Sequence, residues 1–256
     1  MMAELPALNP KKRPRTVAPQ GLRGKVAVIT GASRGIGQAM ADALAREGCN
    51  VVITGRGEVA LKKAAARLAK YRSSIFPFAC DVRHPQAVAA LFAAVRRRFH
   101  RVDILVNNAG VAHADLPVSG LPLEAWKEVI ETNLTGMFLV TQAALPWMKP
   151  GSVIVNNLSI AAKRVFPGSS AYNASKHGAL GFTNTLREEL REQGIRVIAL
   201  LPGATDTEIW NTLWPEAPRK KMMSPKTVVQ AVVAALSAPD DGTVEELTIL
   251  PAAGTL

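Results

Sequence analysis

The sequence predicts an α/β fold in which a doubly wound sheet of seven parallel strands lies between two layers of helices, a three-layer α/β/α arrangement. The first observation is a series of short runs rich in β-branched residues, each of strand length. These runs lie at residues 25–30, 50–54, 74–80, 102–108, 152–159, 195–202 and 244–250. The second observation is that helical patterns lie between them, at residues 35–48, 58–71, 85–99, 122–148, 170–193 and 224–237. Strands that alternate with helices are typical of βαβ units and therefore of a parallel sheet.

Length and composition favour one domain over residues 21–256. A chain of 256 residues, 48% of them hydrophobic, is long enough to bury a sizeable core. The segment 204–223 interrupts the alternation with two tryptophans and two prolines, so we predict a lid-like insertion beside the site. Residues 1–20 contain the basic run KKRPR between prolines, which predicts a flexible basic leader.

The net charge of +11 indicates attraction to anions, including phosphorylated cofactors. The leader has four basic residues and one acidic residue, so the rest of the chain still carries +8. We find no nucleic-acid-binding motif, and we interpret KKRPR as a solvated tail in preference to a nuclear address. We find no signal peptide and no apolar run long enough for a membrane span, which favours a cytoplasmic protein without membrane partners. Cys49 and Cys80 are interpreted as reduced core thiols, and no histidine pair suggests a metal site.

A glycine-rich segment, TGASRGIGQAM, directly follows the first predicted strand. Gly31, Gly35 and Gly37 permit a tight turn and the close approach of a pyrophosphate to bare backbone. The helix that follows would direct its amide-rich, positive N-terminus at the anion. A plain turn is the alternative, but the place of the segment in a βαβ series favours a dinucleotide site.

The end of the second predicted strand bears on which nicotinamide cofactor would bind. An NAD site usually has an acidic residue there, which binds the ribose 2′-hydroxyl. Here Gly55 and Arg56 occupy that place, and Arg34 lies in the glycine-rich segment. Two guanidinium groups suit a 2′-phosphate. We therefore predict NADP(H), with NAD(H) as the alternative, and assign the nearby Glu58 to the start of a helix.

Six motifs together resemble those of the short-chain dehydrogenase/reductase family, whose members have a Rossmann fold. They occur in the family's order and spacing over roughly residues 22–207. The motifs are TGASRGIG at 30–37, NNAG at 107–110, Asn133 in ETNLTG, Ser159 in NNLSIAA, YNASK at 172–176 and PGATDT at 202–207.

The resemblance implies four catalytic residues. Tyr172 would act as general acid and base, and the Lys176 ammonium would lower the pKa of the phenol and bind the nicotinamide ribose. Ser159 would hydrogen-bond the substrate oxygen, and Asn133 would hold a water that relays protons. Taken singly, each residue has a simpler interpretation. Tyr172 and Lys176 could merely share a solvated helix face. Ser159 could be a turn hydroxyl, and Asn133 a helix-capping or helix-kink residue.

The resemblance also implies a set of cofactor contacts along the strand ends. Asp81 would bind the adenine amino group, although an aspartate there could instead be the N-cap of the next helix. The implied cofactor-binding residues are Gly31, Ser33, Arg34, Gly35, Ile36, Gly37, Arg56, Asp81, Val82, Asn108, Ala109, Gly110, Tyr172, Lys176, Pro202, Gly203 and Thr207.

These observations together predict an NADP(H)-dependent oxidoreductase that interconverts a carbonyl and a secondary alcohol. The ending VEELTILPAAGTL resembles 3-hydroxy-acid and serine dehydrogenase-type members more than the ketoacyl reductases of fatty-acid synthesis. A catalytically silent NADP(H) sensor or scaffold is the alternative, and nucleic-acid binding is the least favoured hypothesis. The family resemblance and the apolar helices at 122–148 and 170–193 also predict a homodimer or homotetramer.

Overall fold

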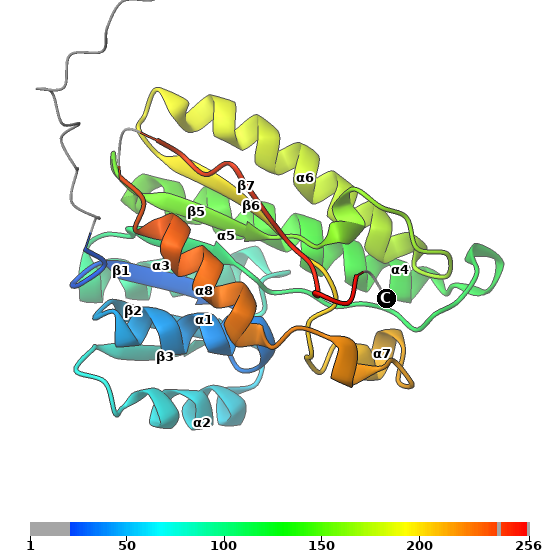
Figure 1. The fold of residues 1–256 in the computed structure, drawn as a ribbon. Helices are drawn as coiled ribbons and strands as arrows, with labels where there is room; N and C mark the ends of the chain where they lie inside the picture. Colours follow the sequence, from blue (N-terminus) through cyan, green and yellow to red (C-terminus); the bar gives the residue numbers. More distant parts are fainter. Residues whose placement is uncertain (1–20, 240–241, 255–256) are drawn as a thin grey trace, which may run out of the picture.

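The computed structural model describes residues 21–239 and 242–254, so the predicted leader at 1–20 lies outside the described residues. The described residues form one parallel sheet of seven strands in the order β3-β2-β1-β4-β5-β6-β7 (Figure 1). This topology confirms the predicted doubly wound sheet. The strands are β1 (Val26–Thr30), β2 (Asn50–Gly55), β3 (Ile75–Ala79), β4 (Ile104–Asn107), β5 (Val153–Asn157), β6 (Arg196–Pro202) and β7 (Glu246–Ile249).

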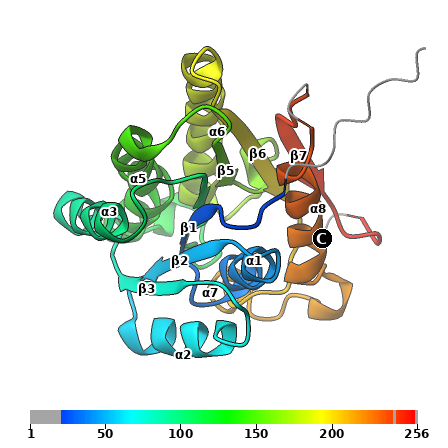
Figure 2. The ribbon, with the colours of Figure 1, turned by 90° about the vertical axis from the view of Figure 1, so that its left-hand side faces the viewer.

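Helices cover both faces of the sheet and make the three predicted layers (Figure 2). One face packs against α1, α2 and α8, and the other against α3, α5 and α6. The longer helices are α1 (Gly35–Arg46), α2 (Glu58–Leu68), α3 (Pro85–Phe99), α4 (Leu123–Ile130), α5 (Gly136–Ala144), α6 (Ser170–Arg191) and α8 (Pro225–Leu236).

The central strands are apolar except at their carboxyl ends, because both of their faces are buried. Ala27 and Ile29 of β1 belong to the core on the α1 side, whereas Val28 between them belongs to the core on the α3 side. Side chains alternate across a strand, so one short apolar run supplies both cores.

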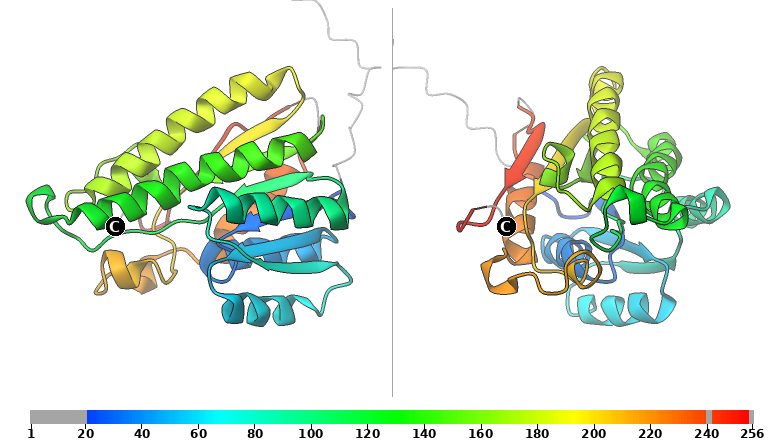
Figure 3. Two further views of the ribbon diagram at one scale, coloured as in Figure 1. Left: turned by 180° about the vertical axis from the view of Figure 1, so that it is seen from behind. Right: turned by 90° about the vertical axis from the view of Figure 1, so that its right-hand side faces the viewer.

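The predicted helix at 122–148 is not one continuous α-helix. After α4 the chain forms a π-helical turn, η2 (Glu131–Thr135), before α5 begins. A short 3-10 turn, η3 (Leu145–Trp147), follows α5 and contains Pro146. Insertions of this kind within helices are frequent at functional sites, and this one contains Asn133. Figure 3 shows α5 and α6 lying side by side along one layer.

The segment 204–223 is compact and is tied to itself by hydrogen bonds. It contains the short helix α7 (Trp210–Leu213) and the 3-10 turn η5 (Arg219–Lys221). Arg219 donates to the Asp206 carboxylate at 2.9 Å and to the Thr207 carbonyl at 2.7 Å. The Trp210 indole donates to the Thr205 carbonyl at 2.9 Å. The segment therefore forms an ordered wall, and whether it moves as a lid stays a prediction.

No helix in the described ranges is long and apolar enough to cross a membrane. Cys49 and Cys80 are buried and unpaired. Burial raises the pKa of the Cys49 thiol to about 12 and that of Cys80 to about 11. Both thiols are therefore protonated at neutral pH, as expected of structural core residues.

Candidate active site

A cavity of about 700 Å³ lies at the carboxyl ends of the central strands. Strand order reverses between β1 and β4, and ligands of doubly wound sheets bind at such a switch point. The cavity is lined by all but two of the residues that the sequence assigns to the site. Those lining it are Gly31, Ser33, Arg34, Gly35, Ile36, Arg56, Asp81, Val82, Asn108, Ala109, Gly110, Ser159, Tyr172, Lys176, Pro202, Gly203 and Thr207.

The glycine-rich loop after β1 has the conformation that its sequence predicts. Gly31 and Gly35 have φ angles of +63° and +56°, in the left-handed region that favours glycine. A Cβ at Gly31 would lie 2.9 Å from the Ala109 Cα, and a Cβ at Gly37 would collide with the Asn108 side chain and the Gly31 carbonyl. Gly37 does not line the cavity, so its part in the site is this close packing.

The N-terminus of α1 is open toward an anion. Its N-cap residue is Arg34, whose side chain makes no hydrogen bond to the first amides of the helix. Unsatisfied amides at a helix N-terminus carry partial positive charge and bind phosphate groups. The loop and this helix end can therefore hold a pyrophosphate.

Asn108 braces the loop against the neighbouring strands. Its side-chain amide donates to the Thr30 carbonyl at 2.9 Å and to the Gly31 carbonyl at 3.2 Å. Its Oδ1 accepts a bond from Asn157 Nδ2 at 2.8 Å. Sequence reasoning missed Asn157, although two adjacent asparagines at the end of an apolar strand were a signal. The Asn157 side chain braces Asn108 beside the glycine-rich loop, and its backbone carbonyl accepts a hydrogen bond from Lys176.

One end of the cavity, which we call the adenine end, is formed by Arg34, Arg56, Asp81, Val82 and Glu128. The Arg56 Nη1 lies 3.4 Å from Glu128 Oε1 of α4, and each side chain is about half exposed, at 53% and 47%. Arg56, which the sequence assigns to a 2′-phosphate, thus already has an acidic partner within the chain. Sequence reasoning missed Glu128, which is 72 residues from Arg56 along the chain.

Asp81 is clamped by Arg83 two residues later. The Arg83 Nη2 lies 2.6 Å from Asp81 Oδ2, and the Arg83 amide donates to Oδ1 at 3.0 Å. These hydrogen bonds hold the pKa of the Asp81 carboxyl below its usual range. The alternative that Asp81 is the N-cap of α3 is wrong, because His84 occupies that position and the Asp81 side chain bonds within its own turn.

The opposite end, which we call the catalytic end, is formed by Ser159, Tyr172, Lys176 and Asn157. The Lys176 Nζ lies 5.5 Å from the centroid of the Tyr172 ring, one turn earlier on α6, and donates to the Asn157 carbonyl at 3.1 Å. The Ser159 side chain interacts with the Tyr172 hydroxyl and acts to lower the pKa of the phenol. Ser159 is the N-cap of the 3-10 turn η4 (Ile160–Ala162), and its Oγ accepts a hydrogen bond from the Ala161 amide at 3.1 Å.

Burial governs the acidity of both groups. Removal from water raises the pKa of the Tyr172 phenol, and the hydrogen bond from Ser159 opposes this only in part. Burial also lowers the pKa of Lys176 to about 8, because only 5% of its surface is exposed. Among the protein's own groups desolvation dominates, and the Lys176 ammonium is held by the Asn157 carbonyl. The lowering of the Tyr172 pKa expected from Lys176 together with oxidised nicotinamide stays a prediction.

Asn133 lies behind the cavity wall and does not line it. It is fully buried in η2, accepts from the Val111 amide at 2.8 Å and donates to the Val111 carbonyl at 2.9 Å. It also donates to Ser175 Oγ at 3.0 Å, a contact that sequence reasoning missed. These bonds tie the π-helical turn to the chain after β4 and to α6, and the water-holding role stays a prediction.

The wall beyond Tyr172 combines apolar side chains with polar ones, among them Glu208, Asn211 and Thr212. Phe166, Trp210, Leu213 and Trp214 line it, together with the carboxylate of Asp115. In the described part of the chain the cationic residues lining the whole cavity are Arg34, Arg56 and Lys176. The first two belong to the adenine end, so this wall offers no arginine or lysine to an anionic substrate.

Comparisons with known proteins agree with this geometry. The chain matches a family model described as short chain dehydrogenase over residues 25–218. A protein of Staphylococcus saprophyticus named as an oxidoreductase is 36% identical over 234 residues, which are 90% of this chain and 98% of that protein. A solved alcohol dehydrogenase from the archaeon Thermococcus sibiricus, complexed with 5-hydroxy-NADP, is 33% identical with a TM-score of 0.84, over 90% of this chain and 97% of that chain.

A solved 3-ketoacyl-(acyl-carrier-protein) reductase from Brucella melitensis, complexed with NADH, is 30% identical with a TM-score of 0.81, over 90% of this chain and 98% of that chain. The matched family model covers the strands and helices that form the cavity, from β1 to the segment after β6. The chain therefore belongs to the short-chain dehydrogenase/reductase family of oxidoreductases.

Proposed function

We propose that this protein is an NADP(H)-dependent oxidoreductase that interconverts a carbonyl and a secondary alcohol. The observation that carries the proposal is the meeting of Ser159, Tyr172 and Lys176 on the wall of a cavity that also contains the glycine-rich loop. A nicotinamide cofactor, when bound, supplies or accepts the hydride. The chain's own residues bind it, orient the substrate and transfer the proton.

The glycine-rich loop fits a dinucleotide by its shape and its charge. The tight packing of Gly31 and Gly37 and the uncapped N-terminus of α1 leave backbone amides free for a pyrophosphate. Gly55, Arg34 and Arg56 at the adenine end suit a 2′-phosphate and support NADP(H). The NADP-type ligand of the Thermococcus sibiricus neighbour supports the same preference, and the NADH of the Brucella melitensis neighbour keeps NAD(H) as the alternative.

The proton would pass through Tyr172. In carbonyl reduction its hydroxyl donates to the substrate oxygen as negative charge develops there, while the Ser159 hydroxyl hydrogen-bonds that oxygen. Burial raises the pKa of Tyr172, so the phenol keeps the proton that it would donate in carbonyl reduction. Lys176 places a positive charge beside the ring, held by the Asn157 carbonyl.

The substrate would be an uncharged carbonyl compound with an apolar body. Trp210, Trp214 and Phe166 offer apolar surface, and Asp115 would repel a carboxylate or phosphate. The carboxylate in the wall disfavours two classes of anionic substrate. They are acyl-carrier substrates and the 3-hydroxy acids that the resemblance of the C-terminus suggests. It favours small ketones, keto esters and quinones.

The decisive experiment is a substrate screen that follows NADPH absorbance beside NADH. We expect reduction of at least one apolar ketone, with kcat/KM higher for NADPH than for NADH. The Tyr172→Phe variant is the control for background reduction. Cofactor binding without turnover across a broad ketone and alcohol panel would instead indicate a sensor or scaffold.

Two further properties belong to this proposal. Self-association as a dimer or tetramer is supported by Phe138 of α5, which is 44% exposed and stacks edge-on against Phe182 of α6 at 6.2 Å between ring centroids. A light-scattering mass of one 27.3 kDa chain would contradict it.

A cytoplasmic location is supported by the two buried, unpaired cysteines.

A further inference from the structure

The segment 204–223 forms part of the wall of the active-site cavity and meets the glycine-rich loop. Thr207 and the residues of α7 line the cavity. The Thr207 side chain packs on the loop, because a Cβ built at Gly35 would lie 3.2 Å from Thr207 Cγ2. The placement of this segment therefore bears on both the proposed cofactor site and the proposed substrate wall.

Backbone hydrogen bonds close the base of the segment. The Met223 amide donates to the Ala204 carbonyl at 3.0 Å, and the Asp206 amide donates to the Met223 carbonyl at 2.8 Å. Between these ends the backbone hydrogen bonds join close neighbours in sequence, such as the bond from the Trp214 amide to the Trp210 carbonyl at 3.0 Å. The arrangement of α7 against the two ends of the segment therefore depends on side chains.

Arg219 supplies contacts between parts of the segment that are distant in sequence. Its Nη1 donates to the Asp206 carboxylate at 2.9 Å and to the Thr207 carbonyl at 2.7 Å, and its Nη2 donates to Asn211 Oδ1 at 2.7 Å. These partners precede Arg219 by 13, 12 and 8 residues. One planar, rigid guanidinium thus joins the start of the segment, α7 and the turn η5.

The exposure of these groups indicates which bonds matter most. The Asp206 side chain is 53% exposed, so its ion pair with Arg219 can be replaced by water at little cost. The bond to the Thr207 carbonyl is partly buried, and water replaces a lost donor less readily there. We therefore expect the fork of donors, more than the charge that it carries, to hold the segment.

We propose that Arg219 is a positioning residue for the oxidoreductase reaction and that it acts through its fork of donors. Arg219 does not line the cavity, whereas Thr207 and α7, which it holds, do. Because the chain itself orders these groups, the cost of ordering them is not borne when NADPH and the ketone bind. This inference rests on the proposed function, since it concerns the cavity in which that reaction would take place.

The first test compares ketone reduction by the native protein and by Arg219→Leu. The KM for the ketone should rise by about tenfold, the factor expected when two or three side chains must be ordered on binding. The Kd for NADPH, measured by fluorescence titration, should rise by a smaller factor, through Thr207. The kcat should change much less than the KM, because a loss of uniform binding leaves the bound complex able to react.

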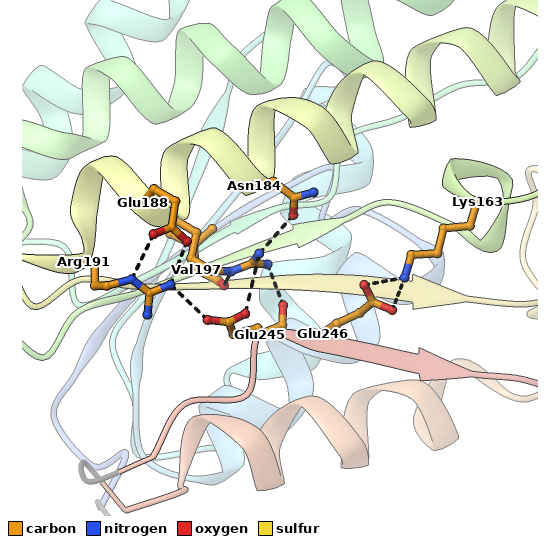
Figure 4. A network of polar contacts seen from close by, with 8 residues as sticks. Lys163, Asn184, Glu188, Arg191, Val197, Glu245 and Glu246 are labelled. Carbon is orange, nitrogen blue, oxygen red and sulfur yellow. Dashed lines mark hydrogen bonds and ion pairs between the residues drawn. The ribbon is translucent and has the colours of Figure 1, made fainter.

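The matched control is Arg191→Leu. Arg191 bonds the Glu188 carboxylate at 2.7 Å and the Glu245 carboxylate at 3.2 Å, as Figure 4 shows. It lies at the end of α6, about 28 Å along the helix from Tyr172. Its loss changes the net charge by the same amount, so any general effect of charge on an anionic cofactor is matched. The KM for the ketone and the Kd for NADPH should both stay unchanged.

Two milder variants separate geometry from charge and remain informative if Arg219→Leu folds poorly. Arg219→Lys keeps the positive charge, but a single ammonium does not reproduce a planar fork that reaches three acceptors. The KM for the ketone should therefore rise nearly as much as in Arg219→Leu. Asp206→Asn removes the ion pair and leaves the bonds to Thr207 and Asn211, so its effect should be small.

Hydrogen exchange gives a readout that does not require turnover. In Arg219→Leu the amides of residues 207–214 should exchange faster than in the native protein, because local opening of the segment becomes easier. The amides of β1 and α6 should exchange as before. Saturating NADPH should reduce the difference between the two proteins, because the bound cofactor orders the segment again.

Three results would overturn the proposal. The first is a KM for the ketone that is unchanged in Arg219→Leu or raised equally in Arg191→Leu. The second is a larger effect of Asp206→Asn than of Arg219→Lys, and the third is unchanged hydrogen exchange across 207–214 in Arg219→Leu. If the native protein reduces no ketone, the proposed function fails, and hydrogen exchange still decides whether Arg219 holds the segment.

Discussion

The two ends of the active-site cavity are built in different ways. At the catalytic end and in the wall behind it, buried polar groups are bonded within the chain: Lys176 donates to the Asn157 carbonyl, and Asn133, behind the wall, donates to Val111 and Ser175. At the adenine end the Arg56–Glu128 pair is about half exposed on both sides.

This difference predicts how strongly each end responds to change. A buried polar group that loses its partner bears the full cost of desolvation, whereas an exposed ion pair exchanges its partner for water. Substitutions at the catalytic end should therefore have large effects on rate or stability. Substitutions at the adenine end should adjust cofactor choice by modest factors.

The largest effect is expected from Tyr172→Phe. Loss of the hydroxyl removes the proposed general acid, and general acid–base groups contribute roughly 10²- to 10⁴-fold to rate. We expect kcat for ketone reduction to fall by about that factor, while NADPH affinity measured by fluorescence titration changes little. Near-native turnover in the variant would exclude Tyr172 as the proton donor.

The pH dependence should reveal Lys176. Its pKa of about 8 means that the ammonium predominates below pH 8 and the neutral amine above it. The raised pKa of Tyr172 keeps its proton over the same range. We expect kcat/KM for reduction to be flat below about pH 8 and then to fall, approaching about tenfold per pH unit. A profile that stays flat up to pH 10 would show that the charge on Lys176 is not needed.

Asn133→Ala tests the buried network through stability. The substitution leaves the Val111 amide and carbonyl and the Ser175 hydroxyl without their partner, and an unsatisfied buried group costs about 1–3 kcal/mol. We expect the free energy of unfolding, measured by urea denaturation, to fall by at least that amount. Ser175→Ala removes only one of these bonds to Asn133 and should cost less. Equal costs for the two variants would contradict the network.

Glu128→Gln should have the smallest effect, at the adenine end. The carboxylate competes with a 2′-phosphate for Arg56, and exposed pairs contribute about 0.2–1 kcal/mol. We expect the KM for NADPH to fall by up to about fivefold, with the KM for NADH unchanged and with a smaller effect at high salt. If both KM values fall together, Glu128 does not act through the 2′-phosphate.

Much of the fold and of the site could be predicted from local patterns. Apolar runs such as those containing Val28 and Val52 mark strands buried on both faces, and the alternation with helices predicts their parallel arrangement. Gly31 and Gly35 reveal a tight turn because few other residues adopt positive φ. These features depend on neighbours in sequence.

The partners of individual side chains could not be predicted in this way. Asn108 and Asn157 are 49 residues apart, and Arg56 and Glu128 are 72 apart, yet each pair is in contact. The break of the helix at η2 also depends on a distant contact, between Asn133 and Val111.

The sequence by itself determined the order of strands and helices, the glycine-rich turn and the types of side chain that follow each strand. Only the tertiary structure decided that Glu128 faces Arg56, and that burial raises the pKa of Tyr172 and lowers that of Lys176. The physical reason is that backbone preference and hydrophobic periodicity act over a few residues. Desolvation and charge pairing depend on which distant segments the completed fold brings together.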